Sequence, residues 1–254
     1  MALVTGAAHR VGKVIAMTLA REGADIVVHY GRSVEAAQQT GQEIAALGRR
    51  VLLHQADMGS WQQAAELGER ALAHFGHVDI LINSASSFVP NDYFSITEAD
   101  FDQAFDVNVK GPFVLSQVIA KVMMASQAEG ICGNIINIAS ISGMIGRDRR
   151  VYAGTEMGGS TVDYAAAKGG VINLTRDMAA WLARYNIRVN CISPGGFWRN
   201  QPEPFVKAYS DATPMGRMGQ DGREMKGPVV FLASEASSYC TGINLVVDGG
   251  FTCW

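Results

Sequence analysis

The chain has few cysteines: four in 254 residues, widely separated and without a Cys-x-x-Cys pair. Their scarcity argues against a disulfide scaffold and a thiolate metal centre, and it favours a reducing, cytoplasmic compartment. Positive charge is not in excess, because the formal net charge is −3, so we expect no nucleic-acid partner. No apolar run approaches the length of a membrane span, so we expect no membrane partner, and no metal site is expected either.

What the chain does have is an alternation of short apolar runs with longer helical patterns, which is typical of βαβ units on a parallel sheet. The expected strands are Ala2–Val4, Asp25–His29, Val51–Gln55, Ile80–Ile82, Asn134–Ile138, Arg188–Ile192 and Asn244–Val247. The expected helices are Val11–Glu22, Ser33–Leu47, Trp61–Phe75, Glu98–Val107, Gly111–Ala128, Val162–Tyr185 and Gly222–Ser234. No repeat or linker divides the chain, so residues 1–254 are predicted to form one α/β domain. The least regular segments, 143–161 and 194–214, are predicted to be functional loops.

Tyr164 and Lys168 lie four residues apart in the segment DYAAAKGG. On a helix this spacing places both side chains on the same face. A nearby ammonium group favours the tyrosinate, so we expect the pKa of Tyr164 to fall below its usual value of roughly 10. A phenol tuned in this way can exchange a proton with an alcohol or a carbonyl oxygen near neutral pH. Taken alone, such a pair is more often an ordinary surface tyrosine and lysine.

The segment ALVTGAAHRVGKVIA predicts a strand, a glycine-containing turn and then a helix. The N–H groups and the positive dipole end at such a helix start can bind a pyrophosphate. Gly6 permits the turn, and Gly12 lets the helix approach the sheet closely. The spacing is not Gly-x-Gly-x-x-Gly, and a purely structural turn is the alternative.

The second expected strand leads into IVVHYGRS, which lacks the acidic residue that bonds a ribose 2′-hydroxyl in NAD sites. Arg32 and Ser33 follow instead, and Arg10 lies in the glycine-containing turn. A guanidinium group and a hydroxyl suit a 2′-phosphate. We therefore predict NADP(H) in preference to NAD(H). The alternative is that Arg32 is a solvated residue at a helix start.

Several motifs, in their order and spacing, resemble those of the short-chain dehydrogenase/reductase family over nearly the whole chain. They are TGAAHRVG, Asp57, NSAS at Asn83–Ser86, Asn108 in FDVNVKG, Ser140 in NIASISG, Tyr164 with Lys168, IRVNCISPGG and TGINLVVDGG. The resemblance implies a Rossmann-like three-layer α/β/α domain with a seven-stranded parallel sheet. It also implies an oxidoreductase that acts on a small-molecule carbonyl or alcohol and assembles as a homotetramer or homodimer.

The resemblance further implies roles for individual residues. Tyr164 would be the acid/base, and Ser140 would hydrogen-bond the substrate oxygen. Lys168 would lower the tyrosine pKa and bond the nicotinamide ribose, while Asn108 would hold a water that links Lys168 to solvent. The implied cofactor contacts are Gly6, Arg10, Val11, Gly12, Tyr30, Arg32, Ser33, Asp57, Met58, Asn83, Ala85, Ser86, Tyr164, Lys168, Pro194 and Gly195.

Two departures from the family pattern bear on function. Arg10 stands where the family has a glycine, and in this respect the chain resembles pteridine reductases. Those enzymes, however, have an aspartate at the position that Ser140 occupies in this chain. Ser140 also precedes Tyr164 by 24 residues (164 − 140), about twice the family's usual spacing, so we assign Ser140 by its NIASISG context. The extra residues fall within 144–161, and we interpret this insertion as part of the substrate wall.

Arg147, Arg149 and Arg150 make the insertion locally basic, which suggests an anionic substrate such as a sugar acid or a phosphopantetheine-linked acyl group. A solvated loop or a subunit contact is the alternative. Four aromatic residues follow the sixth strand, where they form either an apolar lid or the packing of a short helix: Phe197, Trp198, Phe205 and Tyr209. The chain resembles sugar and gluconate-type dehydrogenases and 3-ketoacyl-carrier-protein reductases, and we favour the former.

Three other functions compete with this prediction. A non-catalytic dinucleotide-binding redox sensor would have little reason to retain all four of Asn108, Ser140, Tyr164 and Lys168. A pteridine-type reductase is favoured by Arg10 and disfavoured by Ser140. A sugar-nucleotide epimerase or dehydratase usually needs a larger C-terminal substrate domain than this chain provides.

Overall fold

The computed structural model describes residues 1–90, 92–125 and 133–254. Seven parallel strands form one sheet, which confirms the predicted fold class. Their spatial order is β3 (Val51–Gln55), β2 (Ile26–Tyr30), β1 (Ala2–Val4), β4 (Ile80–Asn83), β5 (Gly133–Ile138), β6 (Ile187–Pro194) and β9 (Asn244–Val247). The expected strands agree with these bounds to within a residue or two.

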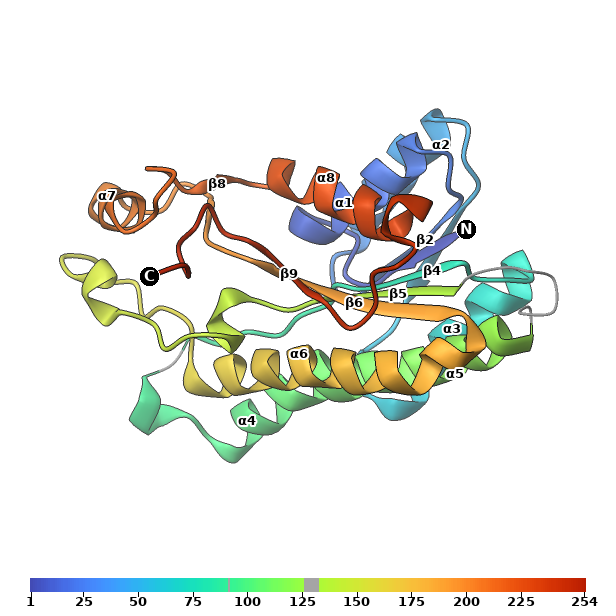
Figure 1. Cartoon of the computed structure of the whole chain (residues 1–254), viewed down its shortest axis with the longest axis horizontal. Helices are drawn as coiled ribbons and strands as arrows, with labels where there is room; N and C mark the ends of the chain where they lie inside the picture. The colour runs from blue at the N-terminus through green and yellow to red at the C-terminus, as the bar shows by residue number, and fades with distance from the viewer. Residues whose placement is uncertain (91, 126–132) are drawn as a thin grey trace.

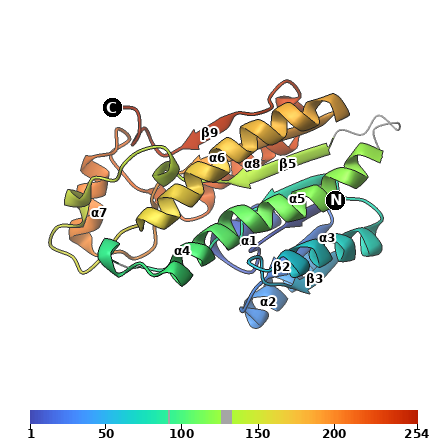
Figure 2. The same cartoon turned by 90° about the horizontal axis from the view of Figure 1, so that it is seen from below.

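Helices cover both faces of the sheet, as Figure 1 shows. One face carries α1 (Arg10–Arg21), α2 (Val34–Ala46) and α8 (Lys226–Ala233). The opposite face carries α3 (Trp61–Phe75), α5 (Gly111–Ala125) and α6 (Val162–Leu182), with α4 (Glu98–Phe105) packed against α6 (Figures 1 and 2). The result is the expected three-layer α/β/α arrangement.

Strand β1 illustrates why the strands are apolar on both sides. Ala2 and Val4 are fully buried in a core cluster that includes residues of α1, α2 and α8, whereas Leu3 is fully buried in a second cluster with residues of α3 and α5. Successive side chains of a strand point to opposite faces, so a strand covered on both faces must be apolar throughout. The continuous apolar runs in the sequence are therefore the signature of this sandwich.

The helix boundaries follow from local signals in the sequence. Ser60 caps the start of α3 by accepting a hydrogen bond from the Gln63 N–H, and α3 ends at Gly76, whose φ of +81° favours glycine. The expected helix Glu98–Val107 is instead α4 followed by a π-helical turn, η2 (Asp106–Lys110), that leads directly into α5. Positions 126–128 of the expected helix Gly111–Ala128 lie outside the described residues.

Four short elements, absent from the expected strands and helices, lie in the irregular segments or just after them. The two-stranded parallel pair β7 (Phe197–Trp198) and β8 (Gly219–Gln220) flanks α7 (Glu203–Asp211), and the insertion contains a 3-10 turn, η5 (Arg149–Tyr152). An apolar cluster packs η5 onto α7, and its buried members are Val151, Tyr152, Phe205, Tyr209 and Met218. Among the described helices, none is both long and apolar enough to cross a membrane.

Candidate active site

The predicted cofactor residues gather along one edge of the sheet. Apart from Tyr164 and Lys168 on α6, the predicted cofactor residues lie at or after the carboxyl ends of β1, β2, β3, β4 and β6, and Ser140 lies after β5. Because all seven strands are parallel, these ends share an edge. The direction of the strand order reverses between β1 and β4, and crevices at such switch points are where open α/β sheets bind ligands.

The turn between β1 and α1 is held in place by His29 of β2. The Gly6 N–H donates to His29 Nδ1 at 3.0 Å, so that nitrogen is the acceptor, and Nε2 then donates to the Ala56 carbonyl at 3.0 Å. Burial lowers the pKa of His29 from 6.5 to about 4, which keeps the ring neutral near pH 7. His29 is therefore a structural residue that fixes the turn relative to β2 and β3.

Thr5 spans the crevice between β1 and β4. Its hydroxyl accepts hydrogen bonds from the N–H groups of Ser84 and Ala85, each at 2.9 Å. A side chain on Gly12 would place its Cβ 2.1 Å from the Gly6 carbonyl oxygen, so α1 lies directly against the turn. The sequence predicted Gly6 and Gly12 here, but it gave no role to Thr5, although that residue belongs to the TGAAHRVG motif.

The start of α1 has the features of an anion site. No acidic residue lies in its first turn, and His9 makes no side-chain capping hydrogen bond. Arg10 is exposed and adopts a φ of +53°, a left-handed conformation that explains why a glycine would be favoured at this position. Because an arginine is kept despite this strain, its guanidinium group is a candidate for function.

Beyond the carboxyl ends of β2 and β3 lie Arg32, Ser33 and Asp57, the residues predicted to bind the adenosine part of the cofactor. Arg32 is exposed, and none of the ion pairs in the described part of the chain involves Arg10 or Arg32. Ser33 precedes α2 without capping it through its side chain, so its hydroxyl remains available. Asp57 is exposed and closes its own turn by accepting the Gly59 N–H at 2.8 Å.

The four predicted catalytic residues lie on three elements around the ends of β4 and β5. Tyr164 and Lys168 lie on α6, Ser140 lies two residues after β5 at the start of a 3-10 turn, and Asn108 lies in the π-helical turn η2. Lys168 is buried, donates from Nζ to the Ile138 carbonyl at 2.8 Å, and places Nζ 5.6 Å from the centre of the Tyr164 ring. π-Helical turns interrupt helices most often at functional sites.

The expected lowering of the Tyr164 pKa is wrong for this structure. Burial raises the pKa of Tyr164, and hydrogen bonds with Ser140 and Ser86 together with the charges of Arg147 and Arg199 only partly oppose that rise. Burial likewise lowers the pKa of Lys168 from 10.5 to about 8. The spacing of Tyr164 and Lys168 identified the pair, but it carried no information on how deeply the two side chains are buried.

Asn108 is fully engaged as a hydrogen-bond donor. Its Nδ2 group donates to the carbonyls of Ser87 at 2.9 Å and Ala104 at 2.8 Å, and its Oδ1 accepts from the Ser86 hydroxyl at 2.7 Å. Ser86 thereby lies between Asn108 and Tyr164, because its hydroxyl also acts to lower the pKa of the phenol. Sequence reasoning placed Ser86 among the cofactor contacts and did not predict this connection.

A buried polar chain positions α6 against the sheet. The Asn83 Nδ2 group donates to Asn137 Oδ1 at 2.8 Å, and the Asn137 Nδ2 group donates to the Thr175 hydroxyl at 2.9 Å. Buried polar groups that pair in this way fix the relative position of the elements that carry them. The polar Asn137 within the apolar run NIINI was the signal for this network, which sequence reasoning missed.

The insertion lies beside the catalytic residues, and its side chains are ordered by specific contacts. Arg147 donates from Nη1 to the Tyr152 hydroxyl at 2.7 Å and from Nη2 to the Ser142 hydroxyl at 2.8 Å. The Ser142 N–H in turn donates to Ser140 Oγ at 3.1 Å. The insertion is thus joined through Ser142 to the predicted catalytic serine.

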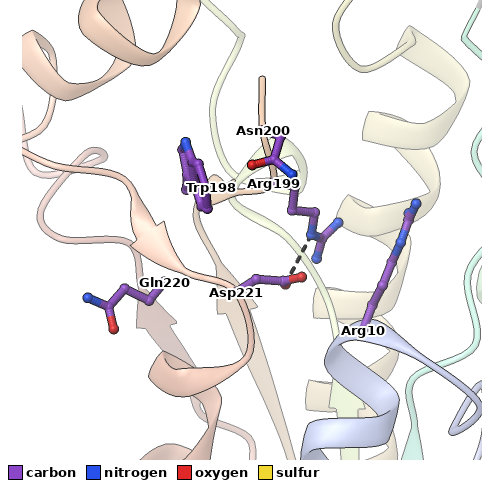
Figure 3. A pocket seen from close by; sticks show the side chains of 6 residues that line it. All are labelled: Arg10, Trp198, Arg199, Asn200, Gln220 and Asp221. Atoms are coloured by element: carbon purple, nitrogen blue, oxygen red, sulfur yellow. Dashed lines mark hydrogen bonds and ion pairs between the residues drawn. The ribbon is translucent and has the colours of Figure 1, made fainter. Parts of the chain in front are cut away.

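The aromatic residues after β6 divide between the two expected roles. Phe205 and Tyr209 are buried and pack α7, where the Tyr209 hydroxyl accepts the Gly196 N–H at 2.6 Å, and Phe197 is buried in the main core, so these three residues do not form a lid. Trp198 is half exposed. It lines a cavity of about 650 Å³ whose other lining residues, shown in Figure 3, are Arg10, Arg199, Asn200, Gln220 and Asp221.

This cavity joins the start of α1 to the β7–β8 pair. Arg199 and Asp221 form an ion pair at 3.0 Å across it, and the Arg10 side chain points into the same space (Figure 3). Pro194 and Gly195 lie just before β7, and the Gly195 N–H donates to the Val247 carbonyl at 2.9 Å. Among the residues that the structure describes, no group of three or more His, Cys, Asp or Glu side chains could hold a metal ion.

Comparisons with known proteins agree with this geometry. Residues 6–252 match the family described as Enoyl-(Acyl carrier protein) reductase. The chain is 37% identical to a 2-dehydro-3-deoxy-D-gluconate 5-dehydrogenase of Escherichia coli, over 99% of this chain and 94% of that protein. It is 32% identical to a 3-oxoacyl-[acyl-carrier-protein] reductase of Staphylococcus epidermidis, over 98% of this chain and 97% of that protein.

Solved structures give the same result. A gluconate 5-dehydrogenase from Burkholderia cenocepacia, in complex with NADP and tartrate, superposes with a TM-score of 0.87 at 31% identity, over all of this chain and 95% of that one. The fold, the site and these relatives together define the class: the chain belongs to the short-chain dehydrogenase/reductase family. It is an oxidoreductase that acts on CH–OH and C=O groups.

Proposed function

We propose that this protein transfers hydride between NADP(H) and a carbonyl or secondary alcohol, with Tyr164 as the acid/base. The observation that carries the proposal is the gathering of three groups: the Tyr164 phenol lies close enough to the Ser140 hydroxyl for that hydroxyl to act on its pKa, and the buried Lys168 places Nζ 5.6 Å from the centre of the Tyr164 ring. Two hydroxyls that meet in this way can both reach one substrate oxygen. Polar donors at the position where negative charge develops are a main source of catalytic rate.

The chain's own residues account for the proton transfer. NADP(H), when bound, supplies or accepts the hydride. During reduction Tyr164 gives its proton to the substrate oxygen, and Ser140 donates a hydrogen bond to the same oxygen while negative charge develops. The Lys168 ammonium group stabilises the tyrosinate that remains. Asn108 holds Ser86 beside the phenol by accepting the hydrogen bond of its hydroxyl at 2.7 Å.

The residues at the carboxyl edge of the sheet fit a phosphorylated dinucleotide. The uncapped start of α1 offers N–H groups to a pyrophosphate, and Gly12 keeps α1 close to the turn. Exposed Arg32, without a carboxylate partner among the described residues, supports a 2′-phosphate. Replacing Arg32 with alanine should therefore raise KM for NADPH and leave KM for NADH nearly unchanged. An equal effect on both cofactors would contradict the assignment.

The substrate proposed here is a keto or hydroxy sugar acid. This class is favoured by the basic insertion beside Tyr164, and it agrees with the named reaction of the E. coli relative. The second candidate is a ketoacyl thioester, the class named for the S. epidermidis relative. Oxidation of NADPH and NADH should be followed with a panel of keto sugar acids, uncharged ketoses, ketoacyl thioesters and simple ketones. Turnover of none of these carbonyl compounds with either cofactor would contradict the proposed function.

A further inference from the structure

The three arginines of the insertion have different surroundings, although the sequence treats them alike. Arg150 is exposed and forms an ion pair with the adjacent Asp148 at 2.7 Å. Arg149 is also exposed and reaches only the Gly158 carbonyl, at 3.4 Å. Arg147 is half buried, and no carboxylate in the described residues lies within ion-pair distance of it. Of the three arginines of the insertion, only Arg147 therefore has a guanidinium group that is both half buried and without a carboxylate partner among the described residues.

Two hydroxyl groups hold the Arg147 guanidinium in a defined position. The bonds to Tyr152 at 2.7 Å and Ser142 at 2.8 Å use two of its five N–H donors, which leaves three for a ligand. Tyr152 is buried, and its ring packs against Phe205 of α7 with the ring centres 5.1 Å apart. A guanidinium group whose position is fixed before binding loses little entropy when it binds a carboxylate.

The position of Arg147 relative to the reacting groups is also defined. Ser142, which accepts from Arg147, donates its own N–H to Ser140 Oγ at 3.1 Å. One residue therefore separates the guanidinium group from the serine that would hold the substrate oxygen. The positive charge of Arg147 acts to lower the pKa of Tyr164, against the larger effect of burial, which agrees with a place near the phenol.

We infer that Arg147 binds the carboxylate of an anionic keto or hydroxy acid substrate while Ser140 and Tyr164 hold its carbonyl or hydroxyl oxygen. Arg149 and Arg150 take no part in this recognition. Tyr152 is a positioning residue that acts through Arg147. The inference rests on the proposed function, because it requires a substrate oxygen at Ser140 and Tyr164. It goes further by naming the residue that selects the charged substrate.

The test compares two probes of similar size, 5-keto-D-gluconate and D-fructose, with NADPH. Arg147→Met should lower kcat/KM for the keto acid about 10- to 100-fold, mainly through KM, and change that for the uncharged ketose less than about threefold. Arg149→Met is the matched control and should leave both values unchanged. Arg147→Lys keeps the charge but loses the paired donors, so it should recover part of the lost kcat/KM.

Tyr152→Phe keeps the packed ring and removes the hydroxyl that accepts from Arg147. It should weaken discrimination between the two probes in the same direction as Arg147→Met and by less, mainly through a higher KM for the keto acid. Fluorescence titration with NADPH reports whether each variant is folded and binds dinucleotide.

The outcomes separate this inference from the proposed function. Reduction of the keto acid by the wild type, with Arg147→Met losing efficiency equally on both probes, would overturn the role of Arg147 alone. The role of Arg147 is also overturned if Arg149→Met is the variant that loses kcat/KM for the keto acid and not for the ketose. A wild type that reduces only the uncharged ketose also overturns the role of Arg147 and leaves hydride transfer standing. Failure to reduce either probe or any other carbonyl compound of the panel overturns both.

Discussion

Replacing Lys168 with methionine should change how the stability of the protein depends on pH. Lys168 is 3% exposed, its Nζ is bonded to the Ile138 carbonyl at 2.8 Å, and burial lowers its pKa from 10.5 to about 8. The unfolded chain retains the usual value. Between about pH 8 and 10.5 the unfolded state therefore binds more protons than the folded state, and the wild type becomes more stable as pH rises.

The magnitude follows from the two pKa values. Their difference corresponds to about 3 kcal/mol, which is present in full as destabilisation below pH 8 and is relieved above 10.5. The wild-type free energy of unfolding, relative to that of Lys168→Met, should increase by about 2–3 kcal/mol between pH 7 and pH 10. The loss of the bond to the Ile138 carbonyl shifts the variant equally at every pH, so it does not affect this change.

Urea unfolding of both proteins, followed by tryptophan fluorescence at pH 7, 8, 9 and 10 without cofactor, measures the effect. Other titrating groups are common to the two proteins and cancel in the difference. If the difference in the free energy of unfolding stays constant within about 0.5 kcal/mol, the lysine is not buried as described, and its place beside Tyr164 must be revised.

Two further predictions concern the groups around the site. A Cβ at Gly143 would lie 2.5 Å from the backbone nitrogen of Gly169, so Gly143→Ala should push the turn that carries Ser140 away from α6. We expect this variant to be destabilised by about 1–3 kcal/mol and its kcat to fall at least tenfold. The matched variant Gly146→Ala, which has open space around the added Cβ, should show neither effect. Unfolding and steady-state assays decide, and equal behaviour of the two variants would contradict the close packing. As pH falls from 6.5 to 4, the unfolded wild-type chain takes up a proton on His29 before the folded protein does, because the pKa of His29 is about 4 in the folded protein. This uptake lowers the wild-type free energy of unfolding by about 3 kcal/mol, and His29→Gln should not show that loss. The same acid sensitivity in both proteins would show that His29 is not buried and neutral.

Most of the fold could be predicted from the sequence because the parallel sheet is covered on both faces. A strand such as β1, with Ala2 and Val4 on one face and Leu3 on the other, has to be apolar throughout, and that pattern is visible in the sequence. The pair Tyr164 and Lys168 could be found from its helical spacing, whereas Ser140 and Asn108 were assigned because the motifs around them resemble those of the family. These are local patterns, and they do not depend on the details of packing.

What the sequence did not predict depends on contacts between distant segments. The burial of Lys168 and the hydrogen bond between Ser86 and Asn108 are set by how α6, η2 and the β4 loop pack together. Arg147, Arg149 and Arg150 are equivalent as a basic run, and only tertiary contacts with Tyr152 and Ser142 distinguish the first of them. Whether the aromatic residues after β6 form a lid or pack a short helix was left open by the sequence, because α7 is short and is stabilised by burial of two aromatic side chains rather than by its own propensity.

The central claim, that the Tyr164 phenol transfers the proton, is tested most directly by Tyr164→Phe. Reduction of a keto acid by NADPH should be measured for this variant and the wild type, with the dissociation constant of NADPH determined in parallel. We predict that kcat falls by about 10²–10⁴-fold while NADPH binding changes less than about threefold. Retention of the wild-type rate in a variant that still binds NADPH would contradict the assignment.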